Sequence, residues 1–182
     1  MNTLTKLTLL SAAASGLVLS LATAQQPTVA KTNLLTNPSF EDGMNGWSFA
    51  AHEKRGTVSV DTVEKHDGKN SIRIDNPAGD DSFLQQTVTV KPKTRYRLTG
   101  YLKTKDVVVK GAGASFSLAG GFERSDAFDG KQNWKKVSFE FDSGAVDSIK
   151  IGPRLGHYSN MAMGTAWYDD LQLIEIGPSR KR

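Results

Sequence analysis

The sequence contains no cysteine in 182 residues, so no disulfide framework can stabilise the fold. It also lacks the local motifs of common catalytic sites, namely a Gly-x-Ser-x-Gly nucleophile elbow, a His-Glu-x-x-His zinc motif and a Gly-x-x-x-x-Gly-Lys phosphate loop. The three histidines, His52, His66 and His157, stand far apart, and none lies at metal-ligand spacing from another. The sequence therefore gives no support for an enzyme, and we expect no catalytic residues.

Long apolar runs are also scarce, and the one candidate lies at the N-terminus. Residues 1–24 combine Lys6, an apolar and small-residue run from Leu7 to Leu21, and small residues before Gln25, a pattern typical of a secretory signal. Serines and a glycine dilute this short run, which makes a retained membrane anchor the weaker alternative. We expect a protein that is secreted, periplasmic or held at the cell surface by a partner, with no membrane span.

The excess of positive charge is confined to the ends of the chain. The sequence has 23 Lys and Arg against 19 Asp and Glu, a formal net charge of +4. Lys6 belongs to the predicted signal, and Arg180, Lys181 and Arg182 follow the last predicted strand, so the remaining chain is formally neutral. Nucleic acid is therefore not expected as a ligand, because polyanion binding needs a basic surface.

The body of the chain alternates apolar and polar residues with a period of two. Residues 25–32 form a short polar linker, residues 33–176 carry about nine or ten short alternating runs separated by turn residues, and residues 177–182 form a basic tail. In one such run Tyr96, Leu98 and Leu102 alternate with Arg97 and Tyr101. The pattern predicts an all-β domain, a two-sheet antiparallel β-sandwich or jelly roll.

Motifs at both ends of this domain resemble a known family. The first is Asn33-Leu34-Leu35-Thr36-Asn37-Pro38-Ser39-Phe40-Glu41, followed by Gly46-Trp47, and the last is Trp167-Tyr168-Asp169-Asp170-Leu171. With His66-Asp67-Gly68-Lys69 between them, they resemble the carbohydrate-binding modules of the galactose-binding-like jelly-roll superfold that accompany bacterial cellulases and xylanases, which bind cellulose and xylan. The resemblance spans residues 33–176.

The resemblance implies a structural calcium ion. Its ligands would be the Glu41 carboxylate, Asp169 through its side chain and carbonyl, and main-chain carbonyls near Ser39 and Lys69. Asp169 shares its strand parity with Leu171, so it is expected to point inward, where an unpaired carboxylate is costly. The alternative is that Glu41 and Asp169 pair with Lys or Arg and no ion binds.

The sugar site is sought among aromatic and planar polar side chains that do not face the core, because rings pack on sugar C–H faces and polar groups bond hydroxyls. The strand parity places such residues opposite the core positions: Arg73, Gln85, Arg97, Tyr101 and Glu140. Tyr101 is the preferred stacking ring, and the alternative is that it covers the rim of the sheet. The resemblance implies that a concave sheet holds a β-glycan in a cleft.

A site built from loops is the other possibility, since loops on a rigid scaffold often carry binding residues. Tyr158 belongs to this set, with Phe122, Phe128 and His157. The first hypothesis is thus a secreted, non-catalytic protein that binds a β-linked polysaccharide or oligosaccharide and holds one calcium ion. The second is a protein-interaction or adhesion module of the same fold, without a sugar site and with an extracellular protein partner.

Overall fold

The computed structural model describes residues 31–158 and 160–180. The predicted signal, 1–24, and most of the predicted linker, 25–32, lie outside the described residues. Within the described residues the regular structure consists of strands, and none of it is a helix that is long and apolar enough to span a membrane. The strands are β1 (Ser48–Ala51), β2 (Thr57–Asp61), β3 (Ser71–Asp80), β4 (Ser82–Thr89), β5 (Thr94–Val109), β6 (Ala114–Leu118), β7 (Gly130–Asp142), β8 (Ser148–Leu155) and β9 (Ala162–Pro178).

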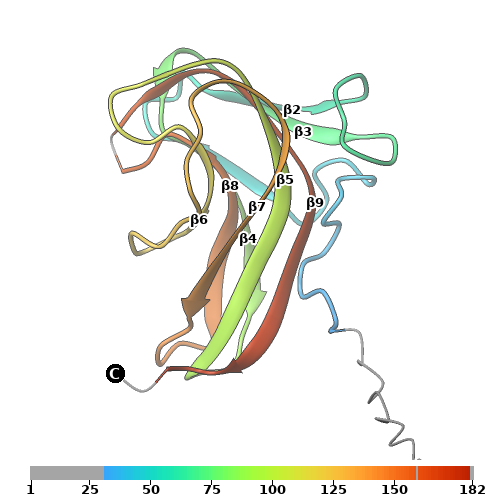
Figure 1. The fold of residues 1–182 in the computed structure, drawn as a ribbon, viewed down its shortest axis with the longest axis vertical. Helices are drawn as coiled ribbons and strands as arrows, with labels where there is room; N and C mark the ends of the chain where they lie inside the picture. Colours follow the sequence, from blue (N-terminus) through green and yellow to red (C-terminus); the bar gives the residue numbers. More distant parts are fainter. Residues whose placement is uncertain (1–30, 159, 181–182) are drawn as a thin grey trace, which may run out of the picture. The chain divides into compact units, whose positions relative to one another are not determined.

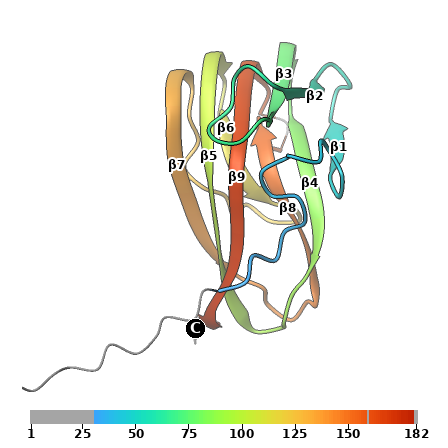
Figure 2. The same cartoon turned by 90° about the vertical axis from the view of Figure 1, so that its right-hand side faces the viewer.

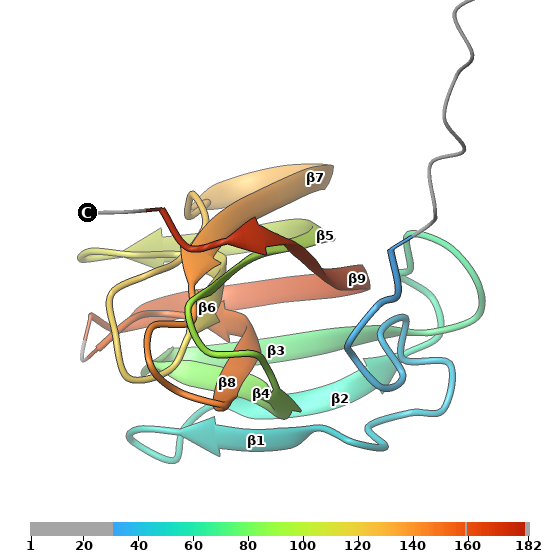
Figure 3. The ribbon, with the colours of Figure 1, turned by 90° about the horizontal axis from the view of Figure 1, so that it is seen from below.

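The strands form two antiparallel sheets, which confirms the predicted β-sandwich. One sheet has four strands in the order β1-β4-β8-β6, and the other has five in the order β2-β3-β9-β5-β7. Figure 1 shows the two layers edge-on, with β5 and β9 on one side and β6 and β8 on the other, and Figure 3 shows them from below. Strands that neighbour one another in a sheet are often far apart in the sequence, as in a jelly roll.

The core lies between the sheets and follows the period-two pattern. On β5 the side chains of Tyr96, Leu98 and Leu102 are buried, whereas Arg97 is exposed. Phe116 of β6 and Tyr168 of β9 are fully buried, and their rings meet edge-on with centroids 5.7 Å apart. Burial of these apolar surfaces is the main force that holds the sheets together.

The segment 31–47 closes the open side between the two sheets. Its backbone pairs with the C-terminal half of β9, where Leu34 N donates to Leu173 O. Gln86 of β4 binds the same segment from the other sheet, because its side chain accepts from Thr36 N at 2.8 Å and donates to Thr36 O at 2.9 Å. Figure 2 shows this segment beside β9, and it shows the loop 62–70 crossing over β9 toward β5.

Two predicted boundaries are wrong. Residues 76–79, Asn-Pro-Ala-Gly, are among the turn residues that separate the alternating runs and so predict a turn between two strands. Instead β3 continues to Asp80, with a register shift between Asn76 and Asp80. The Asn76 amide donates to Asp80 O and Leu155 O and so satisfies backbone groups that this irregularity leaves unpaired. The tail expected at 177–182 begins later, because the end of β9 still pairs with Thr94 as far as Pro178. Arg180 is exposed, and residues 181–182 lie outside the described residues.

Candidate functional site

The structure does not bring the six predicted sugar-binding residues together. Four lie on the outer face of the five-stranded sheet: Arg73 on β3, Arg97 and Tyr101 on β5, and Glu140 on β7. Gln85 lies on β4 of the other sheet and is half-buried, and Tyr158 follows β8. The outer faces of the two sheets point in opposite directions, so one sugar chain cannot contact both sets.

Most polar groups of the four residues on the five-stranded sheet already have protein partners. Arg73 Nε lies 2.7 Å from Asp75 Oδ2. Arg97 Nε donates to Glu140 Oε1 at 2.9 Å, and Arg95 also pairs with Glu140. The hydrogen bond from Arg97 and the charges of both arginines hold the pKa of Glu140 below its usual value. These ion pairs leave few groups on this part of the sheet for a ligand.

A different cluster lies on the outer face of the four-stranded sheet, around Arg154 of β8. Its guanidinium makes a bidentate ion pair with Asp81, with Nε 2.7 Å from Oδ1 and Nη2 2.5 Å from Oδ2. Both side chains are buried. The ring centroids of Phe83 and Tyr158 lie 5.0 Å and 4.5 Å from the guanidinium carbon, which is the distance of a cation–π contact.

Aromatic rings continue this cluster outward to solvent. Tyr158 contacts His157 with ring centroids 4.7 Å apart, and it contacts Phe122 at 5.4 Å. Phe122 comes from the connection between β6 and β7, residues 119–129, and 81% of its surface is exposed, against 39% for Tyr158. Two large rings exposed side by side are unusual on a protein surface and indicate a binding site.

Two buried polar atoms near these rings lack partners. Among the described residues, His157 Nε2 and Ser115 Oγ have no hydrogen-bond partner. Burial lowers the pKa of His157, and the positive charges of Arg154 and Arg124 lower it further, so the imidazole is neutral at pH 7. Buried polar atoms are nearly always hydrogen-bonded, so unpaired ones beside exposed rings indicate a ligand or bound water.

The same face of β8 continues to a cavity at its other end. Lys150 is four residues from Arg154 and therefore points to the same side of the strand. It lines a cavity of about 460 Å³ with Thr87 of β4 and with Ala119 and Gly120, which follow β6. Four residues of strand span about 13 Å. We call this stretch of the outer face of β8, from Arg154 to Lys150, the track.

Glycine occupies the middle of this track. A Cβ at Gly152 would lie 2.3 Å from the carbonyl oxygen of Leu84 and 2.9 Å from the ring of Trp47. Distances this short do not occur between real atoms, so no larger residue fits without moving β4. β8 therefore carries no side chain between Arg154 and Lys150 on this face.

The predicted metal ligands meet around one turn. Glu41 Oε1 accepts from the backbone N–H groups of Lys69 and Asn70, which lowers the pKa of Glu41. Asp169 Oδ2 accepts from the N–H groups of His66 and Asp67 at 2.9 and 3.3 Å. Asp169 is fully buried, and burial raises its pKa to about 6. The predicted inward direction is wrong, however, because Asp169 is the register partner of the outward-facing Tyr101 and is covered by the loop 62–70. The register shift beside Asp170, whose φ is 49°, breaks the alternation between Asp169 and Leu171. Two carboxylates from distant parts of the chain therefore hold the turn 66–70.

The predicted ligand atoms are carboxylate and carbonyl oxygens, the kind that calcium prefers. Within residues 31–158 and 160–180, Glu41 Oε2 and the main-chain carbonyls of Ser39 and Lys69 have no hydrogen-bond partner. The described residues hold no cluster of three or more His, Cys, Asp or Glu side chains arranged for a metal. An ion at this turn would therefore depend on carbonyl oxygens as well as carboxylates, which calcium accepts.

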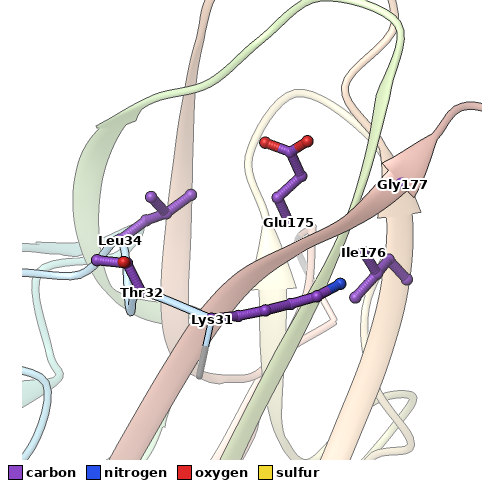
Figure 4. A pocket seen from close by; sticks show the side chains of 6 residues that line it. All are labelled: Lys31, Thr32, Leu34, Glu175, Ile176 and Gly177. Carbon is purple, nitrogen blue, oxygen red and sulfur yellow. The ribbon is translucent and has the colours of Figure 1, made fainter. Parts of the chain in front are cut away.

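A cavity of about 370 Å³ between the segment 31–34 and the end of β9 offers fewer groups that could recognise a ligand. It is lined by Lys31, Thr32, Leu34, Glu175, Ile176 and Gly177 (Figure 4). Figure 4 shows the Lys31 side chain extended toward Ile176, with the Glu175 carboxylate pointing elsewhere. Glu175 pairs with Lys91 at 2.8 Å. No aromatic ring lines this cavity, so it does not resemble a sugar site.

Sequence reasoning misses Asp81, Phe83 and Arg154. Asp80 and Asp81 are two adjacent acids in a turn-like stretch, a pattern that predicts solvated loop residues. A local signal for Arg154 does exist, because it is the one charged residue in the run from Ile151 to Tyr158. Its partner Asp81 is 73 residues away in the sequence, so only the fold reveals the pair.

Comparison with known proteins now decides the family. The sequence pattern of the family described as "Carbohydrate binding domain" matches residues 32–151. This chain belongs to the carbohydrate binding domain family. The matched region includes Asp81, Phe83 and Phe122 of the cluster and ends before Arg154.

Curated relatives of this carbohydrate binding domain are much longer proteins. The tRNA nuclease WapA of Bacillus subtilis (strain 168) is 29% identical over 161 residues, which cover 79% of this chain and 7% of WapA. Exochitinase 1 of Streptomyces olivaceoviridis is 26% identical over 173 residues, which cover 94% of this chain and 26% of the chitinase. The chain therefore spans a minor part of the length of the relatives it matches.

Solved structures share the fold. TmCBM61, solved in complex with beta-1,4-galactotriose, matches with a TM-score of 0.58 and 23% identity over 80% of this chain and 99% of that one. The CBM22-1 xylan-binding domain from Paenibacillus barcinonensis Xyn10C matches with a TM-score of 0.55 and 19% identity, over 82% and 98% of the two chains. At these identities the likeness establishes the sandwich fold and leaves the ligand open.

Proposed function

We propose that this protein is a non-catalytic carbohydrate-binding protein whose sugar site is the outer face of the four-stranded sheet. The observation that carries the proposal is the exposed pair of rings, Phe122 and Tyr158, beside the buried ion pair of Arg154 and Asp81. Rings provide the stacking surface for sugar C–H groups, and polar side chains near them bind the hydroxyls.

Each group in the cluster has a role in this proposal. Tyr158 and Phe122 stack on sugar rings. Arg154 Nη1 makes no hydrogen bond to the described residues and is available as a donor to a hydroxyl. His157 Nε2 and Ser115 Oγ are unpaired among the described residues and can bond a hydroxyl or a bridging water. Asp81 holds the guanidinium in place, so little side-chain entropy is lost on binding.

The ligand class we propose is a neutral, β-linked polysaccharide. The track from Arg154 to the cavity at Lys150 extends along β8 and suits a chain of several units. The formal neutrality of the chain between the predicted signal and the basic tail suits an uncharged polymer. TmCBM61 was solved with beta-1,4-galactotriose, and the Paenibacillus domain is a xylan-binding one, which supports β-1,4-linked glycans as the first candidates.

The export signal and the calcium ion belong to the proposal as well. Residues 1–24 would direct the chain out of the cytoplasm, to the side of the membrane on which polysaccharide ligands are found. Calcium would be held by the carboxylates of Glu41 and Asp169 with the carbonyls of Ser39 and Lys69, and its chemistry there would be structural. Asp169 is buried, and a cation beside it would offset the cost of its charge.

Affinity electrophoresis tests the sugar site. The protein is run through gels that contain xylan, β-1,4-galactan, cellulose derivatives or glycol chitin. We expect retardation by at least one β-linked glycan and a tenfold or greater loss of affinity in Tyr158→Ala, as for a central aromatic contact. Val63→Ala is the control, because it removes an exposed apolar side chain from the connection between β2 and β3, which belong to the other sheet.

Two outcomes contradict the proposal. Retardation that Tyr158→Ala leaves unchanged would place the sugar elsewhere on the molecule. Migration unaffected by every glycan would favour the alternative function, in which the exposed rings contact an extracellular protein.

A further inference from the structure

A cavity lies at the end of the five-stranded sheet where β9 begins, opposite the C-terminus of the chain (Figure 1). Its volume is about 450 Å³, within the range of ~300–1,000 Å³ that small-molecule sites occupy. Met163 of its lining and Asp169, six positions further along β9, are separated by about 20 Å of strand. We propose that this cavity binds a linear aliphatic carboxylate, with the alkyl chain against its apolar lining and the carboxylate beside Lys110.

Two irregularities in the sheet, one on each side of β9, form this cavity. Residues 76–80 of β3 take four steps opposite two steps of β9, and residues 105–108 of β5 take three steps opposite two steps of β9. Bulges of this kind bend a strand and re-aim its side chains, and they occur preferentially beside functional sites. Ala78 and Gly79 of the β3 bulge line one side of the cavity, and β5 beyond its bulge lines the other.

The lining of this cavity is mostly apolar. Val108 is 64% exposed and Met163 is 46% exposed, so two large apolar side chains are open to solvent at the same place. A Cβ at Gly79 would lie 3.3 Å from Met163 Cγ and 3.7 Å from Met161 Cβ, so both methionine side chains lie against the β3 bulge. The described residues of the lining include no aromatic ring, which a sugar would need. Methionine adapts to irregular apolar shapes, so this lining suits a flexible alkyl chain.

The charged side chains that line the cavity are both cations, Arg55 and Lys110. Arg55 Nη2 donates to Glu53 Oε2 at 3.0 Å, and Arg55 Nη1 donates to Ala78 O at 3.4 Å, so this guanidinium already has partners. Lys110 is exposed and makes no ion pair with another described residue. One uncompensated positive charge beside an apolar surface is complementary to a ligand with one negative charge and an apolar body.

This inference goes beyond the proposed function and does not depend on it. The cavity belongs to the five-stranded sheet, whereas the Arg154 cluster lies on the four-stranded one, and the two ligands differ in chemistry. With both sites occupied, one molecule of the protein would retain an aliphatic acid at the surface of the polysaccharide that it binds.

Nuclear magnetic resonance of the ¹⁵N-labelled protein tests the cavity. Hexanoate, octanoate, decanoate and uncharged 1-octanol are titrated into the wild type, Lys110→Gln and Met163→Ala, and the amide signal of Val108 reports binding. Lys105→Gln is the matched control for charge, because Lys105 is exposed on the same strand and lies outside the cavity. Val63→Ala is the control for the loss of an exposed apolar side chain. A dispersed spectrum for each variant shows that it is folded.

We expect saturable shifts of the Val108 signal with octanoate. The affinity should rise at least twofold for each CH₂ added from hexanoate to decanoate, up to the fourfold that corresponds to ~0.8 kcal/mol per buried CH₂. 1-Octanol should bind at least fivefold more weakly than octanoate, because it lacks the charge that Lys110 recognises. Lys110→Gln and Met163→Ala should each weaken octanoate binding at least threefold, and both control variants should bind octanoate as the wild type does.

Three results overturn the proposal. Equal affinity for 1-octanol and octanoate, or wild-type affinity in Lys110→Gln, excludes recognition of the carboxylate. The absence of shifts with every acid excludes the site, and a concentration-dependent dimer that Val108→Ser abolishes then assigns the apolar surface to a second copy of the chain. None of these results bears on the proposed function, which is tested with sugars by affinity electrophoresis.

Discussion

The buried ion pair between Arg154 and Asp81 allows the sharpest prediction about stability. Replacing Arg154 by Met keeps the length and apolar contacts of the side chain but removes the partner of Asp81, whose carboxylate then stays buried without a counter-charge. Removing one member of a buried pair costs about 3–5 kcal/mol, because the remaining charge keeps its desolvation penalty. The Asp81→Ala variant leaves the guanidinium in the same position and should cost a similar amount.

The double variant distinguishes this reasoning from a simple loss of contacts. When both charges are replaced by apolar groups, no unpaired charge remains, and the cost should fall to about 0–2 kcal/mol. The two single costs are therefore expected not to add, and the coupling energy should exceed about 3 kcal/mol. With a urea m-value of about 2 kcal/mol/M, each single variant lowers the unfolding midpoint by about 2 M.

Urea unfolding followed by tryptophan fluorescence measures these costs, since Trp47 and Trp167 are buried. Arg97→Met is the matched control, because it removes an exposed ion pair with Glu140, and exposed ion pairs contribute about 0–1 kcal/mol to the free energy of unfolding. The reasoning is refuted if Arg154→Met costs no more than Arg97→Met, or if the cost of the double variant equals the sum of the single costs.

Three further predictions concern single features of the fold. Gly152→Ala should lower the free energy of unfolding by about 1–3 kcal/mol or more, because the new Cβ would lie 2.3 Å from the Leu84 carbonyl oxygen. Ser148→Ala, at the exposed start of the same strand, is the control, and an equal urea midpoint for the two variants would contradict this prediction. Burial alone would raise the pKa of Asp80, but hydrogen bonds from the N–H groups of four residues outweigh it and lower the pKa below 3.8. The stability that the Asp80 carboxylate contributes is therefore present above pH 3.8 and is lost as the pH falls through the lowered pKa. The difference in unfolding free energy between wild type and Asp80→Asn should narrow as the pH falls below 3.8, and a constant difference would argue against this account. Chelation of calcium with EGTA should lower the melting temperature of the wild type by several degrees. It should not change the melting temperature of Glu41→Gln, which lacks one of the proposed carboxylate ligands. An unchanged melting temperature in the wild type would contradict a calcium ion at the turn 66–70.

The strands themselves can be predicted from the sequence because side-chain direction in a strand depends on local parity. Tyr96, Leu98 and Leu102 point into the core as expected. Asp169 does not, because a register shift beside Asp170 breaks the alternation and leaves Asp169 beneath the loop 62–70. The motifs at the two ends of the domain also indicate the family, because each is a short run of neighbouring residues. The boundary errors at Asn76 and Pro178 arise where a long-range hydrogen bond or strand partner, invisible in the local sequence, extends a strand.

Parity states whether a residue faces the core or solvent, but it does not state which sheet a strand joins. Arg97 and Gln85 both face outward, yet they lie on opposite sides of the molecule, because β5 and β4 belong to different sheets. The place of Tyr158 in a loop makes it a candidate from sequence, but Arg154 and Asp81 become neighbours only when β8 lies beside the start of β4.

The sequence by itself thus determined the β-sandwich, the family and the absence of disulfides, since each depends on composition or on patterns a few residues long. The tertiary structure alone decided which outward-facing residues share a surface, and so it separated the Arg154 cluster on the four-stranded sheet from Tyr101 and Glu140 on the five-stranded one. The physical reason is that sheet pairing brings together residues 70 or more positions apart, and the energy that selects those pairs comes from burial over the whole core rather than from any local segment.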